Sequence, residues 1–230
     1  DVQMTYAHLD TEMIKRFRET MTREELESWY QRLLDSYHKW LSYQMKWREE
    51  RNRSMEKLEF PFIYRKGQKE MVAGIYHAIS RKEQIFIQAP TGVGKTMSAV
   101  FPAVRSIGEG KAETLFYLTA RTITRTVAQD AFEILRKNGL LFKTVTITAK
   151  EKLCFCEKPE CNPETCPYAK GHYDRINDAV YELWTNEQSF DRETILRQAE
   201  KWQVCPFEMS LELSVWMDAV ICDYNYVFDP

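Results

Sequence analysis

The stretch Ala89-Pro90-Thr91-Gly92-Val93-Gly94-Lys95-Thr96 decides how the rest of the chain is interpreted. Apart from alanine in place of the first glycine, it matches the phosphate-binding loop Gly-x4-Gly-Lys-Thr. A short apolar run, residues 85–89, comes before it, and a helical pattern over residues 97–107 comes after it. A strand, a glycine turn and a helix in this order are the context that such a loop requires. An accidental match at a loop without function is the weaker interpretation.

The residue types of this loop predict a binding site for the phosphates of a nucleoside triphosphate. Gly92 and Gly94 allow successive backbone N–H groups to turn toward phosphate oxygens. The start of the following helix adds the positive end of its dipole. Lys95 is expected to reach the β- and γ-phosphates of ATP and the Thr96 hydroxyl to bind Mg²⁺, so these two are the predicted catalytic residues. The predicted nucleotide-binding residues of the loop are Pro90, Thr91, Gly92, Val93, Gly94, Lys95 and Thr96.

A second nucleotide-binding element is predicted upstream, at Arg65-Lys66-Gly67-Gln68. A glutamine amide can both donate to and accept from the edge of adenine. An Arg-x-x-Gln pair is a weak signal alone, because such pairs are common on exposed helix surfaces. Together with the downstream loop it predicts that Arg65 and Gln68 belong to the nucleotide site.

Outward from the loop, β-rich runs alternate with amphipathic helical patterns. This alternation predicts an α/β fold with a doubly wound, mostly parallel sheet. The expected strands are residues 85–89, 114–120, 144–148 and 219–224, and the expected helices are residues 66–80, 97–107, 123–137, 173–184 and 192–202.

Residues 1–58 follow a different pattern. A short strand is expected over residues 2–8, and a long helix is expected to begin at a capping box formed by Thr22 and Glu25. Phe60-Pro61-Phe62 ends this helix and marks the first domain boundary. An aromatic stripe along the helix favours packing against a neighbouring domain over stacking on nucleic-acid bases.

Composition excludes several classes of protein. The 230 residues carry a formal net charge of −2, so no overall basic field indicates a protein that coats nucleic acid. No apolar run is long enough to span a membrane and no secretory signal is present, so a cytoplasmic location is expected. Because the chain begins at Asp1 and not at methionine, it is expected to be a fragment.

The 6 cysteines are concentrated in one region: Cys154, Cys156, Cys161 and Cys166 lie together and Cys205 follows. Thiols gathered in this way favour zinc or an iron–sulfur cluster over disulfides in a chain without a secretory signal. Zinc ribbons use Cys-x2-Cys knuckles, and none occurs among these positions. A group of structural thiols that bind no metal is the remaining alternative.

Residues 60–230 resemble the first half of the motor of the XPD/DinG group of superfamily 2 DNA helicases. The resemblance is carried by Tyr64-Arg65-x-x-Gln68, the loop at 89–96, Leu118-Thr119-Ala120-Arg121-Thr122, Glu151-Lys152-Leu153-Cys154, Cys166-Pro167-Tyr168, Cys205-Pro206-Phe207 and the segment 219–230. The order and spacing of these motifs make the resemblance specific. It implies a RecA-like P-loop domain with an inserted iron–sulfur cluster domain and an amino-terminal helical extension.

The resemblance also implies a ligand set and contacts with DNA. Four cysteines would hold a [4Fe–4S] cluster: Cys154, Cys166 and Cys205, with Cys161 preferred to Cys156 as the second ligand because two ligands one residue apart would strain a corner of the cluster. Thr119 and Arg121 would touch the backbone of single-stranded or forked DNA. Gln68 stands where superfamily 2 helicases place the glutamine that reads adenine.

The function implied is an ATP-dependent DNA helicase of DNA repair that moves 5′ to 3′ on single-stranded DNA. The expected domains are a helical connector, residues 1–58, which weakly resembles the tail of a nuclease-like domain; the first part of the RecA-like domain, 59–150; the cluster insertion, 151–210; and a return strand, 211–230. No Asp-Glu-Ala-His segment occurs, so this chain is not expected to hydrolyse ATP alone. The alternatives are another P-loop ATPase, or a nucleic-acid-binding module, with a structural zinc site.

Overall fold

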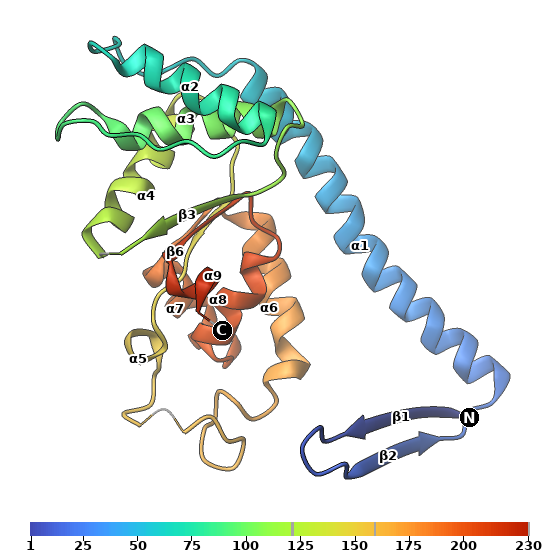
Figure 1. Ribbon diagram of the computed structural model, residues 1–230. Coiled ribbons are helices and arrows are strands. Elements are labelled where there is room, and N and C mark those ends of the chain that lie inside the picture. Colours follow the sequence, from blue (N-terminus) through green and yellow to red (C-terminus); the bar gives the residue numbers. More distant parts are fainter. Residues whose placement is uncertain (121, 159, 230) are drawn as a thin grey trace. The chain divides into compact units, whose positions relative to one another are not determined.

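The structure is a computed structural model that describes residues 1–120, 122–158 and 160–229 (Figure 1). The chain forms two compact units, Asp1–Lys46 and Trp47–Pro230. Helix α1, Arg23–Glu56, runs from the first unit into the second. Among the described residues, no helix combines the length and the apolar character needed to cross a membrane.

The first unit consists of a hairpin and the greater part of α1. Strand β1, Val2–Ala7, confirms the predicted strand, and it pairs in antiparallel register with β2, Ile14–Glu19, which the sequence analysis did not predict. At the start of α1 the capping box is confirmed, because Thr22 N donates to the Glu25 carboxylate (2.8 Å) and Glu25 N donates to Thr22 Oγ1 (3.2 Å).

The second unit is built on a four-stranded sheet in the order β3-β6-β4-β5, and all of its pairings are parallel. The strands are β3, Leu115–Thr119; β4, Thr144–Thr146; β5, Ser189–Phe190; and β6, Ala219–Asp223. Strand β6 comes late in the sequence yet lies between β3 and β4, which confirms that this segment returns to the sheet. The predicted α/β class is therefore confirmed.

Helices flank this sheet (Figure 1). On one side lie α2, Gln68–Arg81; α3, Lys95–Gly108; and α4, Thr122–Lys137. On the other lie α6, His172–Asn186; α7, Arg192–Trp202; and α8, Pro206–Ser214, while α5, Lys150–Leu153, and α9, Asn225–Phe228, are short. Successive side chains of a strand point to opposite faces. Accordingly Ala219 and Ile221 of β6 belong to the core shared with α3 and α4, whereas the buried Val220 and Cys222 face the other layer.

Residues 85–89, expected to form a buried strand before the phosphate-binding loop, form none, and this prediction was wrong. Ile85 and Ile87 are partly exposed and Phe86 is 92% exposed. The apolar, β-branched character of the run is typical of a strand, but a strand needs a neighbouring edge to satisfy its N–H and C=O groups. Among the described residues no strand lies beside this segment.

A buried carboxylate joins the last turns of α1 to the amino ends of β4 and β6. Asp218, which is 3% exposed, accepts hydrogen bonds from Trp47 Nε1 (3.0 Å), Arg51 Nη1 (2.5 Å) and Lys143 N (2.8 Å). Two of these donors lie one turn apart in α1, and the third is the backbone directly before β4. The carboxylate therefore fixes α1 to the sheet and orders the backbone where β4 begins.

Lys143 is a second buried charge in the same place. Its ammonium donates to the carbonyl oxygens of Trp184 (2.5 Å) and Glu187 (2.7 Å) and lies 4.1 Å from the centre of the Trp47 ring. Burial lowers the pKa of Lys143 to about 8, although the charge of Asp218 acts in the opposite direction. Holding the proton therefore costs the folded protein free energy.

The stability of the protein is expected to rise with pH between about 8 and 10.5 because of Lys143. In this range the unfolded chain still binds the proton that the folded protein has released, so raising the pH favours the folded state. The rise attributable to this group is about 3 kcal/mol at most. Denaturant unfolding across this pH range would measure it. Lys143→Met should remove this component of the rise, and an identical pH dependence in both proteins would contradict the assignment.

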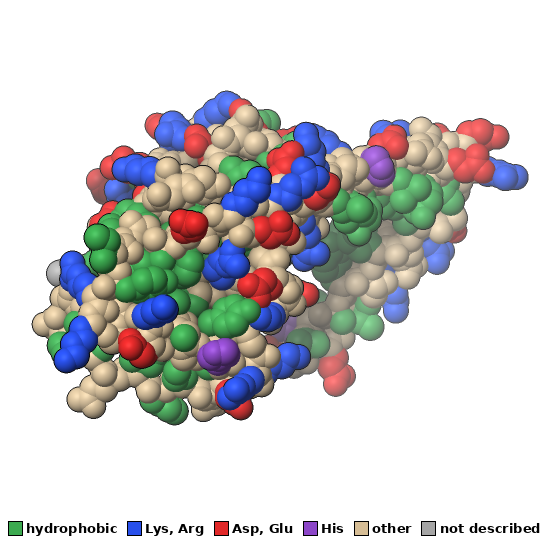
Figure 2. All heavy atoms as spheres, turned by 90° about the horizontal axis from the view of Figure 1, so that it is seen from above, with side chains coloured by type: hydrophobic (Ala, Val, Ile, Leu, Met, Phe, Trp, Pro, Cys, Tyr) green, Lys and Arg blue, Asp and Glu red, His purple; other side chains and the backbone are tan. Residues whose placement is uncertain are grey.

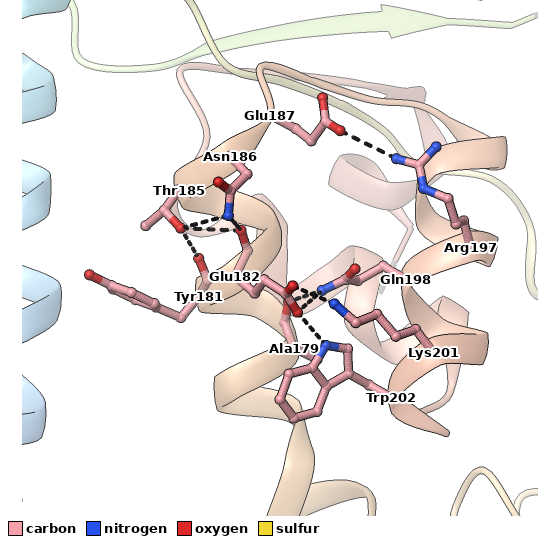
Figure 3. Close-up of polar contacts among 10 residues, drawn as sticks. All are labelled: Ala179, Tyr181, Glu182, Thr185, Asn186, Glu187, Arg197, Gln198, Lys201 and Trp202. Carbon is pink, nitrogen blue, oxygen red and sulfur yellow. Dashed lines mark hydrogen bonds and ion pairs between the residues drawn. The ribbon is translucent and has the colours of Figure 1, made fainter.

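A polar network also holds α6 to α7 (Figure 3). The Glu182 carboxylate accepts from Trp202 Nε1 (2.7 Å) and Gln198 Nε2 (3.2 Å) and pairs with Lys201. The side chain of Glu182 is 37% exposed. Because solvent screens this network, it contributes less to stability than the buried group around Asp218.

Candidate functional site

The phosphate-binding loop has the backbone that the sequence predicts. Gly92 (φ 81°) and Gly94 (φ 79°) both adopt left-handed conformations, and α3 begins at Lys95 directly after the second. The Lys95 ammonium donates to the carbonyl oxygens of Ala89 (2.9 Å) and Pro90 (2.7 Å), so it lies over the loop. The positive end of the α3 dipole and the Lys95 ammonium thus lie together at the loop, where a phosphate would bind.

Arg65 and Gln68 lie against this loop, as predicted for one nucleotide site. The Arg65 guanidinium donates to the carbonyl oxygen of Gly92, and Arg65 N donates to Gln68 Oε1 (3.0 Å). Gln68 is only 4% exposed, and its amide nitrogen would lie 2.7 Å from a Cβ placed on Gly94. A side chain at position 94 would therefore collide with Gln68. This collision is a second reason, besides the left-handed φ, why position 94 requires glycine.

Two hollows adjoin the loop. The larger, of about 450 Å³, lies between the loop and α4 and has Phe62, Lys95, Thr96 and Asp130 among its lining residues. The smaller, of about 230 Å³, lies on the side of Gln68 and is also lined by Met71, Ile87 and Val93. The Figure 2 view looks down on the molecule from above, and there Lys and Arg side chains alternate with Asp and Glu, so this face gathers no single sign of charge.

The predicted DNA contact at the end of β3 is described only in part. Thr119 is 6% exposed, and its hydroxyl has no hydrogen-bond partner among the described residues. It lines a hollow of about 240 Å³ together with Ala120 and Thr124, close to the start of α4. Arg121 lies outside the described residues.

Five cysteines from three segments line one cavity of about 320 Å³. They are Cys154, which directly follows α5; Cys156, Cys161 and Cys166 in the irregular segment after it; and Cys205, which precedes α8. The fold therefore gathers all four of the predicted ligands, and it adds Cys156, which the sequence analysis had set aside.

The surroundings of these thiols differ. Burial raises the pKa of the Cys205 thiol, whereas the backbone N–H groups of Glu208 and Phe207 at the start of α8 favour its thiolate. Hydrogen bonding to Cys161 raises the pKa of Lys150, so a cation stands beside that thiol. A hydrogen bond with Cys166 is the main reason why the pKa of Cys156 is raised to about 11, and their Sγ atoms are 3.8 Å apart.

His172, the first residue of α6, also lines the cavity. It is 4% exposed, burial lowers its pKa, and its Nδ1 accepts the backbone N–H of Cys205 (3.2 Å). The imidazole therefore positions Cys205. Among the described residues, no three His, Cys, Asp or Glu side chains are already gathered closely enough to hold a metal ion. The cysteines form the wall of a cavity and not a preformed tetrahedral site.

Comparisons with known proteins match this chain to two helicase families. Residues 65–162 match the DEAD/DEAH box helicase family, and residues 136–230 match the DEAD_2 family. The chain is 23% identical over 221 residues to a regulator of telomere elongation helicase 1 homolog of Caenorhabditis briggsae, and 22% identical over 217 residues to that of Caenorhabditis elegans. The alignments cover 77% and 75% of this chain.

A shorter match, 43% identical over 49 residues, is to a probable ATP-dependent helicase of Methanocaldococcus jannaschii, of which it covers 7% and of this chain 21%. The chain spans 22% of the length of the two Caenorhabditis proteins. The two family matches overlap over residues 136–162. The first includes the phosphate-binding loop, and the second includes all five cysteines that line the cavity. Taken together, these matches support the amino-terminal part of an XPD-like superfamily 2 helicase motor.

Proposed function

We propose that this chain is the nucleotide-gripping part of an ATP-dependent DNA helicase that moves 5′ to 3′ on single-stranded DNA and carries a [4Fe–4S] cluster near the point of strand separation. The observation that supports it best is that one domain has a phosphate-binding loop and a separate cavity lined by Cys154, Cys161, Cys166 and Cys205. Unwinding of a duplex with a 5′ tail, and not of one with a 3′ tail, by the whole protein tests the direction of movement.

At the nucleotide site, the loop N–H groups and the Lys95 ammonium would hold the phosphates of ATP, and the Thr96 hydroxyl would be a ligand of Mg²⁺. Lys95 would leave the carbonyl oxygens of Ala89 and Pro90 for the phosphates, a short movement of a flexible side chain. Gln68 would bind the edge of adenine. Because its side chain also lies against Gly94, it would link the adenine site to the phosphate-binding loop.

At the DNA site, Thr119 and Arg121 would hold backbone phosphates at the end of β3. The hydroxyl of Thr119 has no hydrogen-bond partner among the described residues, and Thr119 lines the hollow at the end of β3, so a phosphate oxygen in that hollow would give the hydroxyl a partner. The first turn of α4, which starts at Thr122, would add backbone N–H donors. Such contacts hold the strand without reading its sequence.

At the cysteine cavity, the donor set fits an iron–sulfur cluster. Thiolates are the ligands that hold such clusters, and four are needed. Cys156 is in contact with Cys166 and interacts with Cys154, and Cys161 and Cys205 line the same cavity. The Lys150 ammonium and the N–H groups at the start of α8 would offset part of the thiolate charge.

One observation favours a zinc site as the second candidate. Two sulfurs bound to one tetrahedral zinc ion at about 2.3 Å each lie about 3.8 Å apart. The Sγ atoms of Cys156 and Cys166 have this separation. A zinc site of this kind would use Cys156 as a ligand, whereas the proposed cluster leaves it free.

Metal analysis of protein purified without oxygen separates the two candidates. The cluster predicts a brown protein with about four irons and four labile sulfides per chain. Cys166→Ser should remove most of the iron and the visible absorbance. Cys222→Ser is the matched control, since Cys222 is buried in β6, away from the cavity, and should leave the iron content unchanged. A colourless protein with one zinc ion would contradict the cluster.

A further inference from the structure

Cys156, the fifth thiol of the cavity, has no role in the proposed cluster, yet it lies in contact with Cys166, one of the proposed ligands. Cys156 Sγ lies 3.8 Å from Cys166 Sγ, within hydrogen-bond distance for two thiols. Cys156 also interacts with the thiol of Cys154. Two thiols in contact within one cavity are placed to react with each other.

The contact is maintained by the neighbouring side chains as well as by sulfur. Phe155, directly before Cys156, packs on Tyr168, two residues after Cys166, with ring centres 4.6 Å apart. Cys166 itself lies in a turn in which its N–H donates to the carbonyl oxygen of Asn162 (2.8 Å) and its carbonyl accepts from Ala169 N (3.1 Å). The aromatic pair therefore holds the segment of Cys156 against the segment of Cys166.

The backbone around Cys156 allows the remaining approach. A disulfide bond is about 2.05 Å long, so the two sulfurs must approach by less than 2 Å. Cys156 lies in an irregular segment and not in a helix or strand, and both thiols are partly exposed. A small oxidant can therefore reach the pair, and a rotation of the side chains with a small backbone shift can close the bond.

We propose that Cys156 and Cys166 form a disulfide when the cavity holds no metal and the protein meets a peroxide. The Cys166 thiolate attacks the peroxide, the O–O bond breaks, and a sulfenic acid and water form. The Cys156 thiolate then attacks the Cys166 sulfur, the S–S bond forms, and the S–O bond breaks to release a second water. In total two thiols and one hydrogen peroxide give one disulfide and two waters, so the sulfurs lose the two electrons that the peroxide gains.

This disulfide would use a thiol that the proposed cluster needs, so the two states exclude each other. That consequence rests on the proposed function, whereas the disulfide itself rests only on the geometry of the cavity. Cys156 would then serve as a resolving thiol. It would stop the oxidation of Cys166 at a reversible stage, and a thiol reductant would restore the ligand.

The test uses the full chain, reduced, freed of metal with a chelator, treated with hydrogen peroxide and alkylated. Cleavage after Glu157, Glu160 and Glu164 puts Cys156, Cys161 and Cys166 on three different peptides. The expected result is a loss of two hydrogens per chain and one main cross-linked product, which joins the peptide of Cys156 to that of Cys166. Fragmentation of this product, or the Cys154→Ser variant, distinguishes Cys156 from Cys154 on the same peptide.

Two variants make the test sharper. Cys156→Ser should abolish the cross-link and leave a sulfenic acid on Cys166 that dimedone traps. Cys161→Ser, which removes an exposed thiol on the side of Lys150, should leave the yield within about twofold. If Cys166 joins Cys161 or Cys205 instead, or if Cys156 is recovered fully alkylated, the proposal is wrong. Iron analysis of the same protein decides separately whether it binds a cluster, so failure of one proposal can be told from failure of the other.

Discussion

Replacing Asp218 by alanine is expected to lower the free energy of unfolding by about 3–5 kcal/mol, the usual cost of removing one partner of a buried ion pair. Asp218 is 3% exposed, and its loss leaves Nη1 of Arg51, the Trp47 indole N–H and the backbone N–H of Lys143 without their acceptor. The three donor residues are themselves buried, so solvent cannot easily replace the lost oxygen. Denaturant unfolding at neutral pH measures the change.

The matched control is Glu182→Ala. Glu182 also accepts three hydrogen bonds from side chains, but it is partly exposed, so its removal is expected to cost about 1 kcal/mol or less. Asp218→Asn, which keeps the oxygen for two donors but removes the charge, should lie between the two. If Asp218→Ala were no more destabilising than Glu182→Ala, the buried network would not be what fixes α1 to the sheet.

Replacing Lys95 by alanine is expected to weaken binding of Mg²⁺–ATP about 100-fold, which is the effect of losing one well-placed donor to a developing or fixed negative charge. The Lys95 ammonium lies over the loop beside the start of α3, where the phosphates would bind. The lost contact is with phosphate, so the effect should be large for ATP and small for adenosine. Titration of each ligand into the chain measures both.

Lys82→Ala is the control for Lys95. Lys82 follows α2, and its side chain is exposed, so its removal should leave affinity for ATP unchanged. Because Lys95 also bonds to Ala89 and Pro90, its removal could instead loosen the loop. In that case the affinity for adenosine would fall as much as the affinity for ATP, and direct contact with phosphate would be the wrong explanation.

Much of the fold follows from patterns that a short stretch of sequence contains. The apolar periodicity of residues 123–137 appears as α4, and the capping box at Thr22 and Glu25 starts α1, because helices satisfy their hydrogen bonds within a few residues. Hairpin strand β2 was missed, because its charged sequence, Ile14-Lys15-Arg16-Phe17-Arg18-Glu19, has little of the β-branched character expected of a strand. The opposite error occurred at residues 85–89, whose apolar, β-branched character predicted a strand that the structure does not contain.

The nucleotide site is the part that the sequence alone determined most fully. The loop from Ala89 to Thr96 has the left-handed glycines and the helix start that its spacing predicts, since these depend on local backbone chemistry. That Arg65 and Gln68 would touch it also followed from a motif, and the tertiary structure placed Gln68 against Gly94.

Only the tertiary structure decided which thiols meet, which charges are buried and which strands pair. Cys154 and Cys205 are far apart in sequence, and they reach one cavity because α6 and α7 fold back between them. Asp218 and Lys143 look like ordinary surface residues in the sequence, yet the crossing of β6 between β3 and β4 buries both. The physical reason is common to all of these: thiol contacts, burial and strand pairing depend on partners distant in sequence, which no local pattern encodes.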